Sequence, residues 1–443
     1  MYKYYMWQIS KTPGVLDAWR KDGESEEEKL SQWRSSLEEV HEHPRCSNRW
    51  KILKGEEEQT LMLMIYSDDV RHAGGGTRAT KDHNVCHAYV TVMNSPGPAL
   101  RKIGAHWTHH LSYTADYAKE EEERQWGAAV ADLQELVDDG IVLADTSWWA
   151  VKLFILCGDQ MELNKRAGLL YAFSGTYVDR YSYFKKAVRL EATSVHDLKQ
   201  GIIELRTPES QEEEYRLLQD GSATRGTERS PILNTVNSYN VFDEGSTAPC
   251  TAHDLYVGIF KKDLGMIILL WTLTRRTTLA KVSESINKFK LLLRGKDERN
   301  FLGKCNLKKV AGDISIPGNM IQARNLVRYF PLIMRHLLKE DNTLANDCTW
   351  KLLIIMNKIQ RGYQSFAISE SQRINLGHYY EEYLDEKLNV DKAVNNLIGE
   401  EGAATNTLIC KHVTVLHYPS LVKHIGSLAH YSTLVQAGNK LSL

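Results

Sequence analysis

The sequence lacks paired cysteines. Its seven cysteines are scattered, no two of them form a Cys-x-x-Cys pair, and their number is odd. This pattern excludes a disulfide framework and a thiolate zinc site, and it indicates a reducing compartment.

Long apolar runs are also missing. The longest, LGMIILLWTL at 264–273, is about half the roughly 20 residues that a membrane span needs, and charged residues flank it. The first residues, MYKYYMWQIS, have neither the apolar core nor the cleavage site of a secretory signal. We therefore expect a protein that is not secreted and has no membrane partner.

The chain has almost no net charge, with 55 basic against 56 acidic residues, which excludes a globally basic nucleic-acid binder. Residues 281–309 are an exception, with nine Lys or Arg against three Asp or Glu. This segment is either a solvated surface or a contact with the DNA backbone. The candidate DNA-binding residues are Lys288, Lys290, Arg294, Lys296, Arg299, Lys304, Lys308 and Lys309.

What the chain does contain is an alternation of strand and helix patterns. Apolar residues at 61–66, 85–92 and 148–159 predict buried strands, and 103–113 is an ambiguous third strand. A stripe of apolar residues predicts a long helix at 115–140, and a capping box predicts another at 25–44. Residues 207–250, rich in Ser, Thr, Glu, Gly and Asn, are expected to be a long excursion or a flexible insertion. From 252 onward the pattern predicts helices at 252–276, 281–294, 320–339, 346–360, 368–388 and 390–399.

Aspartates follow two of the predicted strands. With the parallel strands taken as 61–67 and 150–157, Asp68 lies one residue beyond the first and Asp159 two residues beyond the second. Parallel strands joined through a helix end at the same edge of a sheet, so the two carboxylates could share Mg²⁺ or Mn²⁺. Two such ions would support phosphoryl transfer. The alternative is that both aspartates are ordinary turn residues.

Five segments resemble CACTA-type DNA transposases and a related group in animal genomes. They are LMIYSDDVRHAGGGTRATKDHNVCHAYVTVMNSP, the stretch from ADLQELVDDGIV to WWAVKLFILCGDQMELNKRAGLLYAFSGTY, PCTAHDLYVGIF, VRYFPLIMRHLLKEDNTLANDCTWKLLIIMNKI and KHVTVLHYPSLVKHIGSLAHYSTLVQAGNK. They occur in the family's order and cover most of residues 60–440. The antigen-receptor recombinase core is a more distant relative with the same layout.

The resemblance implies an α/β fold, with a ribonuclease-H-like mixed sheet core, a large mainly helical insertion and a helical C-terminal region. The implied units are an N-terminal helical segment (1–58), the first part of the core (59–200), the insertion (201–400) and a C-terminal segment that completes the core (401–443).

The resemblance also assigns residues. Asp68 matches the family's first metal-binding acid and Asp159 the second, while His253 and Asp254 match a His-Asp pair. The third acid is missing, because Gln436 or Ala437 stands at its position. Val257 replaces a further glutamate.

The family's structural zinc site has changed as well. His412 and His417 match its histidine pair, which makes them former zinc-site histidines. Asp179 and Ser182, or their neighbours, stand where the Cys-x-x-Cys should be. A tetrahedral zinc site needs its full set of ligands, so we expect the histidines to pack or to form hydrogen bonds.

These matches and departures favour a transposase-derived protein that has lost catalysis and retains binding of DNA or of a protein partner. Mg²⁺ or Mn²⁺ is the expected cofactor if the acidic site is retained. The resemblance implies a nuclear location; the composition alone is equally compatible with a cytoplasmic one. One alternative is an active metal-dependent transposase or nuclease, with Asp254 or Glu244 as the third carboxylate. Another is a helical protein-interaction module, which would have no central mixed sheet.

Overall fold

The computed structural model describes residues 3, 6–7, 10–11, 40–41, 44, 47–57, 59–71, 84–94, 106–113, 119–170, 175–177, 179–289, 302, 305–310, 313–335, 343–365, 367–398 and 407–431. The helix predicted at 25–44 lies mostly outside these residues. At its end, the structure has a short strand instead, β1 (Val40–His41), which pairs with β10 (Ile368–Ser369).

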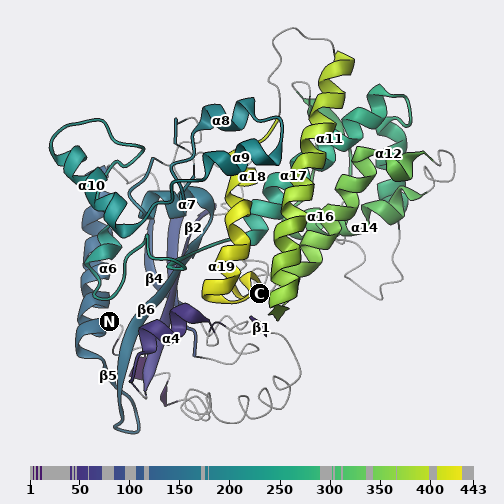
Figure 1. The fold of residues 1–443 in the computed structure, drawn as a ribbon. Coiled ribbons are helices and arrows are strands. Elements are labelled where there is room, and N and C mark those ends of the chain that lie inside the picture. Colours follow the sequence, from purple (N-terminus) through teal and green to yellow (C-terminus); the bar gives the residue numbers. More distant parts are fainter. Residues whose placement is uncertain are drawn as a thin grey trace.

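A mixed sheet organises the first half of the chain (Figure 1). Strand β2 (Thr60–Arg71) lies at its centre, antiparallel to β3 (Asn84–Val92), which is antiparallel to β4 (His106–Tyr113). On its other side β2 pairs in parallel with β6 (Trp148–Gly158). Between β4 and β6 the chain forms helix α6 (Lys119–Asp139) and the short strand β5 (Ile141–Val142), which is antiparallel to β6. The predicted strands and long helix are confirmed, and β4 resolves the ambiguous segment as a strand.

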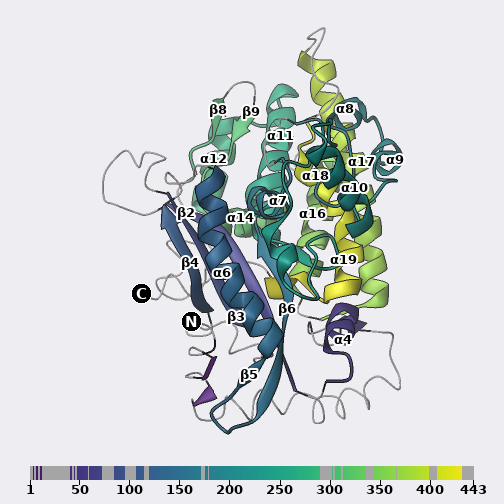
Figure 2. The ribbon, with the colours of Figure 1, turned by 90° about the vertical axis from the view of Figure 1, so that its left-hand side faces the viewer.

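The central strands are buried on both faces, which explains their nearly continuous apolar sequences. Leu61, Leu63 and Ile65 of β2 face a core that contains Trp126 and Leu133 of α6. Figure 2 shows α6 lying across this face of the sheet. The alternate residues of β2, Met62, Met64 and Tyr66, join a second core that extends into the helical half of the molecule.

Strand β7 (Thr247–Pro249) was not predicted. It pairs in parallel with β6 and extends the sheet beyond it. Only three residues long, β7 gives no periodic signal of its own. The described strands of the main path therefore run β4-β3-β2-β6-β5, and β7 pairs with β6 off this path.

Residues 207–250 form a helix, turns and a buried ion pair, so the prediction that they are flexible is wrong. They belong to the segment between β6 and β7. It contains α7 (Gln160–Arg166), α8 (Lys186–Glu191), α9 (Val195–Gly201) and α10 (Pro208–Gln219), followed by a 3-10 turn at Ile232–Thr235. Its polar residues cap and cross-link this structure. Glu214 is fully buried and forms an ion pair with Arg225 at 2.7 Å.

The second half of the chain is mainly helical, as predicted. A π-helix (Ala252–Ile259) continues into α11 (Phe260–Leu273), followed by α12 (Leu279–Lys288), α14 (Met320–Ile333), α16 (Cys348–Gln364) and α17 (Glu370–Ile398). A hairpin of β8 (Lys308–Val310) and β9 (Asp313–Ser315) lies between α12 and α14. The two helices predicted at 368–388 and 390–399 are the single helix α17.

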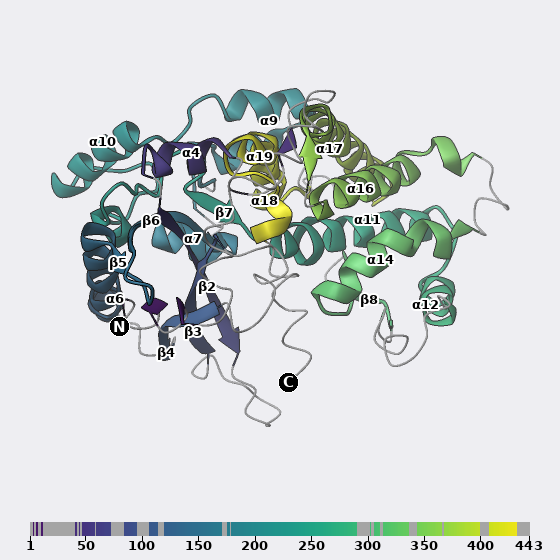
Figure 3. The same ribbon diagram turned by 90° about the horizontal axis from the view of Figure 1, so that it is seen from below.

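The described C-terminal residues lie between the sheet and the helical half, as Figures 1 and 3 both show. They form α18 (Cys410–Thr414), a 3-10 turn (Val415–His417), α19 (Tyr418–Ile425) and a last turn (Leu428–Tyr431). Helix α19 contacts α17 on one side and α4 (Asn48–Lys54) on the other. Within the described residues, no helix is both long and apolar enough to cross a membrane.

Candidate functional site

Asp68 does not lie beyond the end of its strand, so that prediction is wrong. The parallel pairing of β2 with β6 ends at Ser67 opposite Gly158, but β2 continues along β3 as far as Arg71, and Asp68 pairs with His87. Asp68 is therefore the first residue of β2 beyond the parallel ladder. The backbone there is a paired strand, so the turn interpretation does not apply to Asp68.

The side chain of Asp68 is half-buried, close to two other acids and to His253. Burial raises its pKa, His253 opposes this shift, and the nearby carboxylates of Asp159 and Glu162 add to it. A hydrogen bond from the Tyr66 hydroxyl, at 3.3 Å, also lowers the pKa. The net result is a pKa of about 6, so the site disfavours the charged form of Asp68 relative to water.

Asp159 directly follows β6 and is the N-cap of α7. Its Oδ1 accepts a hydrogen bond from the backbone amide of Glu162 at 2.8 Å. This oxygen therefore caps the helix, a role that aspartate commonly has at the N-cap position. The structure nevertheless brings Asp68 and Asp159 to the same edge of the sheet, near enough that Asp159 raises the pKa of Asp68.

Glu162 is an acid of this site that the sequence analysis missed. It is buried on α7, forms an ion pair with Arg166 at 2.6 Å and accepts a short hydrogen bond from Ser67. Burial would raise its pKa, but Arg166 and these hydrogen bonds lower it. Arg166 in turn stacks on Trp126 at 3.9 Å. The pattern Asp159-x-x-Glu162-x-x-x-Arg166 signals both a capped helix start and an i,i+4 ion pair, and it could have revealed this residue.

His253 supplies positive charge to the same edge. Burial alone would lower its pKa, but contact with Cys250 and the carboxylates of Asp68 and Asp159 raise it to about 9. His253 lies on the π-helix, a rare conformation that is frequent at functional sites. The two aspartates therefore face an imidazolium ion at neutral pH.

The two candidate substitutes for the third acid have other partners. Asp254 is fully buried, with Oδ1 at 3.2 Å from Lys411 Nζ and Oδ2 accepting a hydrogen bond from Tyr418 at 2.7 Å. Glu244 is 64% exposed and pairs with His424 at 2.6 Å. Each carboxylate is therefore paired with a side chain of the chain itself, although Asp254 Oδ1 forms only the ion pair with Lys411 and no hydrogen bond within the described residues.

The donor set is therefore a poor fit for two divalent ions. Glu162 and Asp254 are each paired with a cation of the chain itself, and Asp159 caps a helix. In the part of the chain that the structure describes, no three or more His, Cys, Asp or Glu side chains are gathered to hold a metal ion. Gln436 and Ala437, at the position of the missing acid, lie outside that part.

The two histidines that were predicted to come from a former zinc site have separate environments. His417 Nε2 lies 2.9 Å from Asp179 Oδ2, so the structure does bring His417 to the segment of the missing cysteines. His412 is fully buried elsewhere, with Nε2 at 3.2 Å from Asp263. Its Nδ1 accepts a hydrogen bond from the Ile409 amide at 2.9 Å, so Nε2 carries the proton and donates to Asp263. The expected hydrogen-bonding role holds for both, but they do not form a pair.

Only part of the basic segment can be placed. Lys308 and Lys309 are exposed on β8, and Lys288, at the end of α12, pairs with Glu284 at 2.5 Å. The remaining candidates lie outside the described residues: Lys290, Arg294, Lys296, Arg299 and Lys304.

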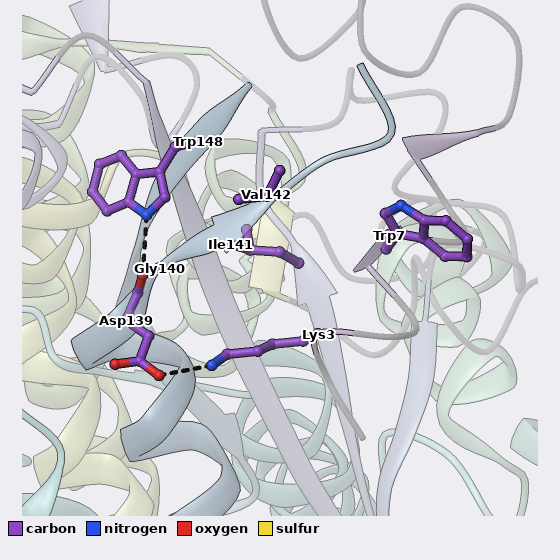
Figure 4. Close-up of a pocket in the computed structure, with 7 residues that line it drawn as sticks. All are labelled: Lys3, Trp7, Asp139, Gly140, Ile141, Val142 and Trp148. Atoms are coloured by element: carbon purple, nitrogen blue, oxygen red, sulfur yellow. Dashed lines mark hydrogen bonds and ion pairs between the residues drawn. The ribbon is translucent and has the colours of Figure 1, made fainter. Parts of the chain in front are cut away.

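An open pocket lies at the opposite end of β6 from Asp159 (Figure 4). It has a volume of about 440 Å³ and contains an ion pair between Lys3 and Asp139 at 2.8 Å. The half-exposed Trp148 donates from Nε1 to the Asp139 carbonyl at 3.0 Å. Since β6 has 11 residues, the pocket is roughly 35 Å from the acidic edge and belongs to a different site. The other lining residues are Trp7, Gly140, Ile141 and Val142.

No protein-family model and no curated protein sequence matches this chain.

Proposed function

We propose that this chain is a transposase-derived protein with a ribonuclease-H-like core that binds DNA without catalysing strand transfer. The observation that carries the proposal is the parallel pairing of β2 with β6, which gathers Asp68 and Asp159 at one edge of the sheet. That arrangement is the one expected for the first two acids of the family's catalytic site.

The order of the strands supports the core assignment. Three consecutive antiparallel strands, β2, β3 and β4, are followed by a helix and by two strands parallel to the first. The ribonuclease-H-like layout implied by the resemblance calls for such a mixed sheet. The mainly helical region after β7 and the return of the chain to the sheet at α18 and α19 are also in keeping with it.

The loss of catalysis is supported by the partners of the acids. A carboxylate that coordinates a metal ion must offer its lone pairs to the ion. Here the carboxylate of Glu162 binds Arg166 and Ser67, and the carboxylate of Asp254 binds Lys411 and Tyr418. His253 provides the positive charge beside Asp68 and Asp159 that an ion would otherwise provide.

DNA binding is supported by the exposed lysines of the β8–β9 hairpin. Lys308 and Lys309 belong to the segment 281–309, which has a large excess of positive charge in a chain whose net charge is −1. Positive charge of this kind binds phosphates and releases counterions, so the affinity should fall steeply with salt.

Fluorescence anisotropy with a labelled 30-base-pair duplex over a series of salt concentrations tests the proposal. We expect binding whose dependence on log salt becomes shallower by up to about 2 in the Lys308→Ala/Lys309→Ala variant, about 0.9 for each phosphate that a lysine no longer neutralises. Lys51→Ala/Lys54→Ala, which removes two exposed lysines of α4, is the matched control and should bind like the wild type. Equal binding by all three proteins, or none, would contradict the assigned surface.

A cleavage assay tests the other half of the proposal. Supercoiled plasmid incubated with the protein and Mn²⁺ should remain intact. Nicking that disappears in an Asp68→Asn variant would show that the acidic site is still catalytic.

A further inference from the structure

A buried polar cluster joins the segment around residue 180 to the C-terminal region. Asp179 is its centre: Oδ2 accepts hydrogen bonds from Ser182 Oγ at 2.6 Å and from His417 Nε2 at 2.9 Å. Oδ1 accepts a third from Thr414 Oγ1 at 3.2 Å. Asp179 and His417 are 238 residues apart, so these hydrogen bonds connect distant parts of the chain.

The carboxylate at the centre of the cluster is shielded from solvent and has several donors, while His417 at its margin is partly buried. Asp179 is 1% exposed, and Ser182 and Thr414 are fully buried. Burial would raise the pKa of Asp179, but His417 and the hydrogen bonds from His417 and Ser182 lower it to about 2. Arg206 reinforces the same segment by donating from Nε to the carbonyls of Asp179 and Ser182, each at 3.3 Å.

These donors do not fit a structural zinc ion. Such a site needs four nitrogen or thiolate ligands in tetrahedral geometry, and the cluster offers one imidazole, one carboxylate and two hydroxyls. The thiol of Cys410, on the same helix as Thr414, donates to Gln160 Oε1 at 3.7 Å and so has another partner. His412, the second histidine that the family would use, is bound to Asp263.

We infer that Asp179, Ser182, Thr414 and His417 form a metal-independent junction that has taken over the structural role of a zinc centre. In it, three hydrogen bonds to one carboxylate connect the two segments that a metal ion would otherwise join. The zinc comparison rests on the proposed transposase origin; the independence from metal rests on the hydrogen bonds alone.

Thermal unfolding of the full chain tests the inference. The midpoint should be the same, within about 1 °C, after dialysis against EDTA and after addition of equimolar Zn²⁺, because zinc binding to the native state alone would raise it. Asp179→Asn should lower the midpoint by several degrees under both conditions, since the amide presents an N–H₂ group to donors that need an acceptor. A fall of the wild-type midpoint in EDTA, or no effect of Asp179→Asn, would overturn the inference.

A second variant tests whether the junction lies where a metal ion could bind. Asp179→Cys/Ser182→Cys places two thiols beside His417, and a water molecule as the fourth ligand completes an open Cys₂His site. The variant should therefore acquire the near-ultraviolet thiolate-to-Co²⁺ absorption band and a Zn²⁺-dependent rise of the midpoint, with the wild type as control. A folded variant that gains neither would overturn the replacement of a zinc centre. Because no DNA is involved, these results are independent of whether the proposed DNA binding fails.

Discussion

Asp68, on the central strand of the sheet, and Asp179, in the segment that follows α7, have opposite electrostatic environments. Asp68 accepts one long hydrogen bond and lies near two other acids, so its pKa is raised to about 6. Asp179 is more deeply buried but accepts three side-chain hydrogen bonds, and its pKa is lowered to about 2. Burial acts on both in the same direction, so the neighbouring charges and the hydrogen-bond donors decide the difference.

This difference separates a retained site from a rebuilt one, if the proposed origin is right. Around Asp68 the acids remain close together, and the carboxylates of Asp159 and Glu162 still raise its pKa although His253 opposes them. Around Asp179 every oxygen has a donor, and the charge stabilises the fold. On the proposed origin, the chain combines a residual acidic edge with a new structural junction, about where the family would place its two kinds of metal.

The largest expected effect is the loss of the junction. In Asp179→Ala, the donors Ser182, Thr414 and His417 lose their common acceptor in a closed interior. We expect the free energy of unfolding at pH 7 to fall by about 3–5 kcal/mol, measured by urea denaturation. Asp220→Ala, at the exposed C-cap of α10, should change it by less than about 0.5 kcal/mol. A similar loss of unfolding free energy in Asp179→Ala and Asp220→Ala would contradict the structural role assigned to the junction.

Glu162→Gln should have the next largest effect, because it leaves the buried guanidinium of Arg166 without its carboxylate. We expect a loss of about 3 kcal/mol, part of which Glu162→Gln/Arg166→Gln should recover. Since Glu162 raises the pKa of Asp68, the single variant should also lower that pKa in a carbon-detected NMR titration. An unchanged Asp68 titration would contradict the coupling between these acids.

Asp68→Asn should stabilise the protein, by up to about 3 kcal/mol at pH 8. The folded pKa of about 6 lies above the unfolded value, so the carboxylate costs stability. This cost is absent below about pH 4, grows toward pH 6 and is constant above it. The two proteins should therefore unfold alike at pH 4 and diverge by pH 8. A gain that does not depend on pH would indicate a cause other than charge.

Asp179 should show the opposite dependence on pH. Because its folded pKa is about 2, its contribution is complete above the unfolded pKa of about 3.9 and is lost as the pH falls toward 2. The advantage of the wild type over Asp179→Asn should accordingly shrink between about pH 5 and pH 2.

The smallest effect is expected for Tyr66→Phe, which removes the 3.3 Å hydrogen bond to Asp68. The free energy of unfolding should change by less than about 1 kcal/mol. The pKa of Asp68 should rise further, because that bond favours the charged form. A pKa that falls in this variant would contradict the assigned role of the hydroxyl.

Much of the sheet could be predicted because its signals are local. The runs around Leu63 and Leu153 are apolar on both faces, and the helix between them has a clear stripe, so the strand–helix–strand order follows from periodicity. Strand β7 has three residues and depends on β6 for its identity. The segment 207–250 misled the prediction because its Ser, Thr and Glu residues form caps and buried ion pairs instead of solvated loops.

The candidate site was predictable only in part, because some of its residues carry a local signal and others meet only through tertiary packing. Asp68 and Asp159 stand out because each follows an apolar run, but Glu162 becomes an acid of the site only when α7 packs it against Ser67. The absence of a Cys-x-x-Cys pair is visible in the sequence, whereas the pairing of Asp179 with His417 in that region is not.

The sequence by itself determined the alternation of strands and helices, the burial of the central strands and the lack of thiolate metal ligands, since each depends on neighbouring residues or on composition. Only the tertiary structure decided which charges are paired. Partners such as Asp179 and His417, or Asp254 and Lys411, come from distant segments, and their energies depend on distances and burial that no local pattern specifies.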